Sequence, residues 1–136
     1  MSTLHAFLHP ETPENQEVVI SQRFKDEEGN VVPFIIRAVS QEESAALKRK
    51  ATKTHRNRAG DTVTDFDADA FTKSLIIAGT VQPDFAATDL CEAYGVLTGD
   101  QVIGKMLLAG EYAALSDAIG RLSGMDDQGV QQEAKN

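Results

Sequence analysis

The segment 99–106 resembles a motif that binds phosphate groups. It reads Gly-Asp-Gln-Val-Ile-Gly-Lys-Met and differs at one position from the P-loop that binds nucleotide phosphates. That position must carry a hydroxyl group to hold magnesium, and Met106 has none. No strand pattern leads into Gly99, and Thr98 with Gln101 fits the capping box of an ordinary helix start. We therefore expect an amphipathic core helix here rather than a nucleotide site.

Three aspartates at alternating positions resemble the first ligands of an EF-hand calcium loop. They are Asp65, Asp67 and Asp69. Such a loop needs glycine at its sixth position and glutamate at its twelfth, where this chain has Ala70 and Ile76. We expect these aspartates to cap the start of a helix.

Histidine and cysteine side chains are the other candidates for metal binding or catalysis. His5 and His9 have the spacing of two ligands on one helix face, but Pro10 follows and no third ligand completes a set. His55 lies alone in a basic segment, and Cys91 has no histidine base in its local sequence. We expect no cofactor, no metal ion and no catalytic residue. The chain should work by binding other proteins, and not as an enzyme.

Charge is distributed unevenly along the 136 residues. The chain has 13 basic and 21 acidic residues and a net charge of −8, which disfavours nucleic acid and anionic membrane as partners. Residues 44–60 contain no acid and six of the basic side chains. This basic segment has three interpretations: a solvated helix end and loop, a docking surface for an acidic or helical protein, or a nucleic-acid patch. The six basic residues are Lys48, Arg49, Lys50, Lys53, Arg56 and Arg58.

The sequence favours the cytoplasm of a cell. Cys91 is the only cysteine, so no disulfide can form within the chain. Residues 1–10 lack the basic and apolar regions of a signal peptide. No apolar run approaches the roughly 20 residues that span a bilayer.

The first regular structure that we predict is a β-hairpin. Residues 17–24 and 31–39 are rich in β-branched and aromatic side chains, and the polar segment 25–30 between them contains Gly29. Pro33 lacks an amide donor and should lie at a strand start or edge.

Helices should follow this hairpin. Ser40 opens a capping box and a helix to about Lys53, and residues 54–65 then form a mobile loop. Asp67 caps the next helix, which ends at Gly79. Further helices are predicted over 88–94, from Thr98, and over 112–122; hydrophobic staples are predicted for Phe66 with Phe71 and Leu97 with Val102.

These elements predict an α+β fold in which an N-terminal β-hairpin precedes a bundle of four to five short helices. We expect an irregular arm over 1–15, one domain over 16–124 that is mostly helical after residue 40, and a disordered tail over 125–136.

The order of several short segments resembles the XkdN-like tail assembly chaperones of tailed phages and prophages. They are Val-Pro-Phe-Ile-Ile-Arg-Ala-Val-Ser at 32–40, Ala-Gly-Thr-Val-Gln-Pro-Asp-Phe at 78–85, Tyr-Gly-Val at 94–96, Leu-Leu-Ala-Gly-Glu-Tyr at 107–112 and Ile-Gly-Arg-Leu-Ser-Gly at 119–124.

This resemblance covers about residues 31–124 and implies a function in the cytoplasm of a bacterial host cell. Proteins of this family are thought to coat the long tape measure protein before the tail tube forms around it, and they are absent from the mature virion. In many phages a frameshifted extension recruits tail tube subunits. The family has no catalytic residues.

Two sets of residues are candidates for partner binding. The first is the basic segment, which would serve a nucleic-acid-binding regulator in our alternative hypothesis. The second is an apolar groove between the last two helices, although most of its residues are expected to be core, with Leu108 the exception. Self-association through the hairpin edges or the 112–122 stripe stays open. The apolar candidates are Met106, Leu108, Tyr112, Leu115 and Ile119.

Overall fold

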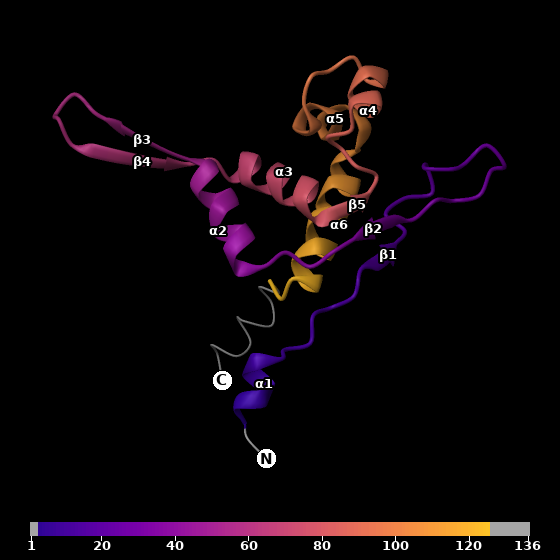
Figure 1. Ribbon diagram of the computed structural model, residues 1–136. Coiled ribbons are helices and arrows are strands. Elements are labelled where there is room, and N and C mark those ends of the chain that lie inside the picture. Colours follow the sequence, from indigo (N-terminus) through magenta and orange to yellow (C-terminus); the bar gives the residue numbers. More distant parts are fainter. Residues whose placement is uncertain (1–2, 126–136) are drawn as a thin grey trace.

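The computed structural model describes residues 3–125, so the tail predicted over 125–136 lies outside it except for Met125. The predicted α+β fold is confirmed, with an N-terminal hairpin and five helices after it in the described residues (Figure 1). The elements are α1 Leu4–Leu8, β1 Gln16–Val18, β2 Phe34–Ile36, α2 Gln41–Lys50, β3 Thr52–Arg56, β4 Thr62–Phe66, α3 Ala68–Gly79, β5 Thr80–Gln82, α4 Thr88–Ala93, α5 Gly99–Met106 and α6 Ala109–Leu122.

The first sheet has the order β1-β2-β5, and both pairs are antiparallel. The predicted hairpin is present, but its paired strands are shorter than predicted, and Pro33 immediately precedes β2. Asp26 closes the connecting turn, because its Oδ1 accepts hydrogen bonds from the amides of Glu28 and Asn30, and Gly29 has a φ of 88°. Strand β5 was not predicted, because three residues directly after a helix are too few to show the alternation of a strand.

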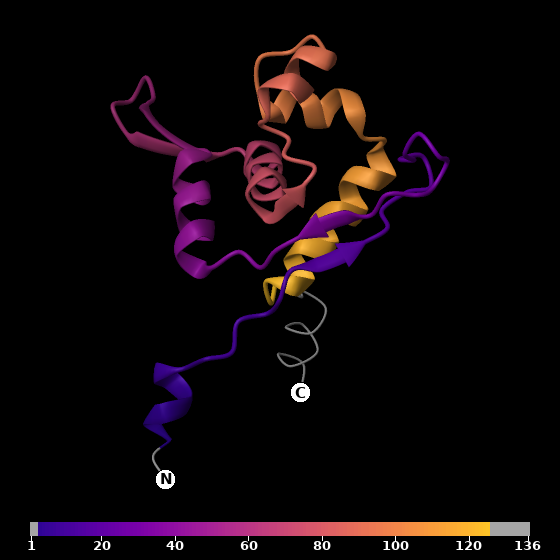
Figure 2. The same cartoon turned by 45° about the vertical axis from the view of Figure 1, so that its right-hand side comes forward.

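The predicted mobile loop over 54–65 is wrong, because most of it forms a second hairpin. We call residues 52–66, comprising β3, β4 and their turn, the β3–β4 arm; it projects from the body of the protein (Figures 1 and 2). Asn57 Oδ1 accepts hydrogen bonds from the amides of Ala59 and Asp61, and Gly60 takes a φ of 85°. Helix α2 correspondingly ends at Lys50 rather than near Lys53.

Most of the predicted helix boundaries are confirmed by their hydrogen bonds. Ser40 and Glu43 form the capping box of α2, and Asp67 Oδ1 accepts from the Ala70 amide at the start of α3. Phe66 and Phe71 pack with ring centroids 5.8 Å apart. The predicted staple of Leu97 with Val102 is wrong: Leu97 is 91% exposed, whereas Val102 is buried in the core.

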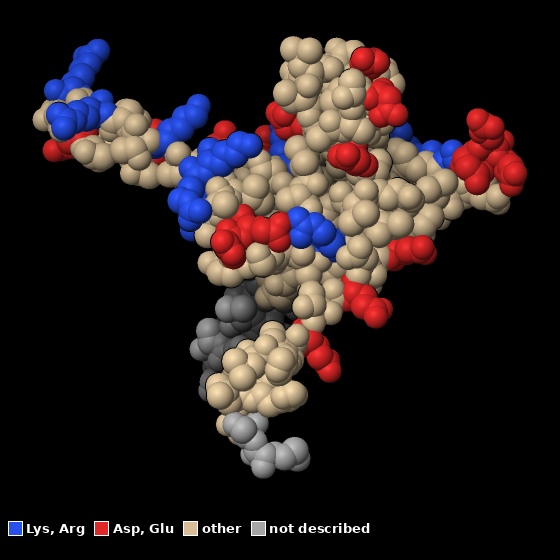
Figure 3. Space-filling model, viewed as in Figure 1, with Lys and Arg blue, Asp and Glu red and all other residues tan. Residues whose placement is uncertain are grey.

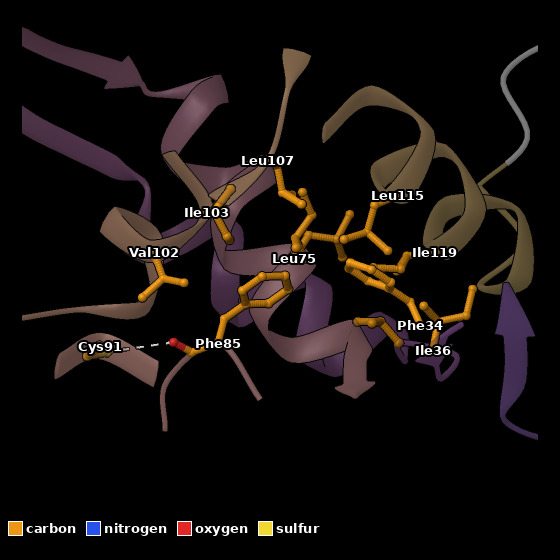
Figure 4. Close-up of a cluster of buried hydrophobic side chains, with 12 residues drawn as sticks. Phe34, Ile36, Leu75, Phe85, Cys91, Val102, Ile103, Leu107, Leu115 and Ile119 are labelled. Atoms are coloured by element: carbon orange, nitrogen blue, oxygen red, sulfur yellow. Dashed lines mark hydrogen bonds between the residues drawn. The ribbon is translucent and has the colours of Figure 1, made fainter. Parts of the chain in front are cut away.

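The core lies where α3, α5 and α6 meet β2, and α3 contacts α2, α5 and α6 (Figure 4). Phe85, in the connection between β5 and α4, is fully buried among these elements. Gly79, the last residue of α3, lies so close to α6 that a Cβ there would be 2.6 Å from Cγ2 of Ile119. The largest fully buried side chains are Phe85, Ile36, Ile76, Ile103, Leu115, Ile119 and Val102.

Arg23 ties the segment between β1 and β2 to the break between α5 and α6. Its guanidinium donates to both carboxylate oxygens of Glu111, at 2.6 and 2.8 Å, and to the carbonyl oxygen of Met106 at 2.9 Å. Glu111 Oε1 also accepts from the Leu108 amide, which caps α6. Hydrogen bonds from Arg23 lower the pKa of Glu111 to about 2.

The first 15 residues, expected to be irregular, contain the short helix α1, none of whose residues is buried. In Figures 1 and 2 this helix lies away from the rest of the protein at the end of an extended segment. It therefore does not contribute to the core.

Gly79→Ala tests the contact between α3 and α6. The added methyl group overpacks against the rigid, buried Ile119, so we expect a loss of about 1–3 kcal/mol in the free energy of unfolding. Gly104→Ala is the control, because a Cβ there meets nothing within 4 Å and the helix should gain about 0.5–1 kcal/mol. Urea denaturation of both variants measures the difference; equal effects would contradict the packing.

Glu111→Gln tests the link made by Arg23. In the folded protein the pKa of Glu111 is about 2, below its ordinary value of 4.5. The ionised carboxylate therefore contributes fully to the free energy of unfolding above pH 4.5, and this contribution is lost as the pH falls toward 2. We expect the variant to lose about 1–2 kcal/mol at neutral pH through weaker charged hydrogen bonds, and to show a smaller loss than the wild type between pH 4.5 and 2. Denaturant titrations between about pH 2 and pH 7 measure the free energy of unfolding of both proteins. Glu92→Gln is the control, because Glu92 is exposed. An unchanged acid profile would contradict the assignment.

Candidate functional site

The basic segment covers the end of α2, strand β3 and the turn of the β3–β4 arm, but not β4. Lys48, Arg49 and Lys50 occupy the last turn of α2, Lys53 and Arg56 lie in β3, and Arg58 lies in the turn of the arm. All six side chains are exposed. Figure 3 shows the basic side chains gathered over this side of the protein, whereas acidic side chains gather at the opposite end, over the turn between β1 and β2.

None of these six cations forms an ion pair in the described part of the chain. Elsewhere, Arg23 pairs with Glu111, Arg37 with Glu43 and Lys73 with Asp69. No ion pair joins Lys25, Lys105 or Arg121 to a carboxylate in residues 3–125 either. On the arm itself, Nδ1 of His55 lies 3.3 Å from Oδ2 of Asp65. The fold therefore leaves the positive charge of this surface available to a partner.

A groove of about 630 Å³ runs between the outer face of α2 and the arm. Ser44 and Ala45 contribute only small side chains to it, and Lys48 and Arg49 add positive charge. We call this the α2 groove; its lining residues are Gln41, Ser44, Ala45, Lys48, Arg49, Thr52 and Thr54.

The register of the arm gives its two faces different chemistry. Thr52 pairs with Phe66, Thr54 with Thr64, and Arg56 with Thr62, and residues paired in this way share one face of a sheet. This face carries four threonines between Phe66 at the base and Arg56 near the turn. Lys53, Asp65, His55 and Val63 share the other face. The Lys48 ammonium lies 5.9 Å from the ring centroid of Phe66, linking α2 to the base of the arm.

Most of the apolar candidates are buried or half-buried, as expected for core residues. Leu115 and Ile119 have no exposed surface and belong to the core, so they are not accessible to a partner in this structure. Met106 is half-buried, and half-buried Tyr112 donates its hydroxyl to Asp69 Oδ1 at 3.1 Å. Leu108 alone of these five is exposed, at 57%.

The motifs rejected in the sequence have structural roles. In segment 99–106, Gly99 packs against the Phe85 carbonyl group, and Val102 and Ile103 are buried, as a core helix requires. Asp69 pairs with Lys73, and hydrogen bonds from Lys73 and then Tyr112 lower its pKa. Cys91 is buried, with its Sγ 3.8 Å from the Phe85 carbonyl oxygen.

No cluster of three His, Cys, Asp or Glu side chains in residues 3–125 is arranged to hold a metal ion. Within the same residues, no helix combines the length and the apolar character that crossing a membrane requires.

The sequence analysis found the cations of the α2 groove but missed the uncharged residues that shape it. Gln41, Ser44, Ala45 and Lys48 recur at helical spacing, and threonines alternate at 52 and 54 and again at 62 and 64. This double pattern could have revealed a helix face that continues into a hairpin. The charged residues and Gly60 between these threonines hide the pattern in the sequence.

Comparison with known proteins identifies the family. The family model described as phage XkdN-like tail assembly chaperone protein matches residues 4–135. The chain is 33% identical to the phage-like element PBSX protein XkdN of Bacillus subtilis strain 168, over 98% of this chain and 93% of that protein.

YqbN, an uncharacterized protein of the same strain, is 37% identical over 90% of this chain and 85% of its own length. The crystal structure of YqbN matches with a TM-score of 0.74 and 31% identity, covering 89% of this chain and 96% of the crystallised one. The order of segments, the α+β fold and these matches agree. The chain belongs to the family of phage XkdN-like tail assembly chaperone proteins.

Proposed function

We propose that this tail assembly chaperone binds the tape measure protein in the cytoplasm of the bacterial host and is not part of the mature virion. Membership of the family supports a function in tail assembly. The observation that supports partner binding is the basic surface of α2 and the β3–β4 arm, whose six exposed cations have no carboxylate partner in residues 3–125.

The charge distribution suits a chaperone of this kind. A long helical client exposes apolar stripes until the tail tube encloses it, and exposed apolar patches lead to aggregation. The chain outside the basic segment carries seven basic against 21 acidic residues. This strongly negative body would keep a complex in solution by repulsion between complexes, while the basic surface faces the client.

The proposed function is non-catalytic and requires no cofactor. The residues that resembled chemical motifs serve the core and the helix ends instead: Met106 ends α5, and Asp67 caps α3. Recruitment of the tail tube protein through a frameshifted extension, and self-association, stay predictions from the sequence.

Co-expression tests the proposed function. We expect the protein to increase the soluble fraction of the long coiled-coil tape measure protein encoded downstream of it, and to co-purify with it. A small acidic protein of unrelated fold is the control, because it supplies negative charge without the basic surface. If the tape measure protein stays insoluble and no complex forms, the proposal is wrong.

A further inference from the structure

We propose that the α2 groove is the docking site for an acidic α-helical segment of the client. This inference rests on the proposed function and extends it, because it names the surface on the chaperone and the chemistry of the segment that it recognises. Three features support it: the shape of the groove, the placement of its cations, and the chemistry of the face that the arm adds to it.

The shape of the groove suits one helix. Residues Gln41 to Arg49 of α2 line one side of the groove over about 12 Å, and Thr52 and Thr54 at the start of β3 line the other side over about 7 Å. Ser44 and Ala45 lie in the groove between larger residues and allow a second backbone to approach closely. Packed helices lie about 8–10 Å apart, and small side chains favour the shorter distance.

The cations lie where they can select an acidic partner. Lys48 and Arg49 line the groove, and Arg56 shares the face of the arm that carries Thr52 and Thr54. A client helix with carboxylates on one face would find both charged partners and hydroxyl donors along its length. Since no carboxylate of the described chain neutralises these cations, docking would break no existing ion pair.

Other occupants fit less well. None of the residues that line the groove is aromatic, so bases of single-stranded nucleic acid have no ring to stack on, and the acidic body repels phosphates. Two copies that each carry a net charge of −8 repel each other, and the acidic cluster between β1 and β2 is a turn closed by Asp26 and Gly29 and not a helix. An acidic helix of another protein is the occupant that matches both shape and charge.

Two double charge reversals separate docking from general electrostatic attraction. Lys48→Glu with Arg49→Glu changes the α2 groove. Lys50→Glu with Lys53→Glu makes the same change in charge within the same segment, but neither residue lines the groove. The full-length chaperone carries each pair. Competition of each variant with labelled wild-type chaperone, in the purified complex with the tape measure protein, measures its dissociation constant relative to wild type. Circular dichroism and thermal unfolding check that both variants fold.

We expect the groove reversal to weaken the complex about tenfold or more and the control reversal to weaken it about threefold or less. Equal weakening by both would overturn the groove as the site while leaving the proposed function intact. No binding by the wild type would instead overturn the proposed function. Tighter binding of a 25-base-pair DNA duplex than of the tape measure protein would show that the groove binds nucleic acid instead of an acidic helix. Loss of self-association in the groove reversal alone would show that the groove binds a second copy of the chain.

Ala45→Trp tests the shape of the groove without changing its charge. The indole would fill the space between α2 and the arm, so we expect about tenfold weaker binding. Ala46→Trp is the matched control, because Ala46 is an exposed alanine of the same helix that does not line the groove. Overlapping 25-residue peptides of the tape measure protein then identify the segment. The binding peptides should carry net negative charge on one helical face; preferential binding of basic peptides would contradict the proposal.

Discussion

The packing of α3 against α6 is the constraint on which the rest of the structure depends. Helix α3 contacts α2, α5 and α6, and its last residue, Gly79, lies so close to α6 that a Cβ there would be 2.6 Å from Cγ2 of Ile119. Near the start of α3, the Tyr112 hydroxyl of α6 donates to Asp69 Oδ1, so α6 contacts both ends of α3. Its first residues follow directly from β4, so the arm and α2 are held to the core through the same helix, and β5 continues from its last residue into the sheet. The surface that we propose for client binding is therefore positioned by the most buried part of the protein.

Basic side chains on the two sides of the molecule differ in whether they pair with a carboxylate. Arg23 and Arg37 each pair with a glutamate, and these glutamates also cap α6 and α2, so their charges stabilise the fold. The cations at the end of α2 and on the arm have no such partner in the described residues. A favourable position near the helix C-terminus explains three of them, since cations there complement the helix dipole. It does not explain Arg56 and Arg58, which lie far along the arm.

The sequence predicted the features that depend on local chemistry. Ser40 and Asp67 marked helix starts, the apolar spacing of Leu115 and Ile119 marked a buried face, and the polar segment before Val31 marked the first hairpin. It did not predict the β3–β4 arm, because charged residues and Gly60 obscured the alternating threonines. Nor did it predict that Leu97 is exposed while Val102 is buried, because whether a hydrophobic staple forms depends on how the preceding loop approaches the helix.

The α2 groove was only half predicted for a related reason. Its cations are visible in the composition of the sequence. Ser44 and Ala45 form part of a groove only because the arm lies next to α2, which the sequence does not show. Hydrogen–deuterium exchange of the full-length chaperone, free and bound to the tape measure protein, tests the central claim most directly. The account predicts slower exchange over α2 and both strands of the arm in the complex. Protection confined to α6 and the exposed Leu108 region, with the arm unchanged, would contradict it.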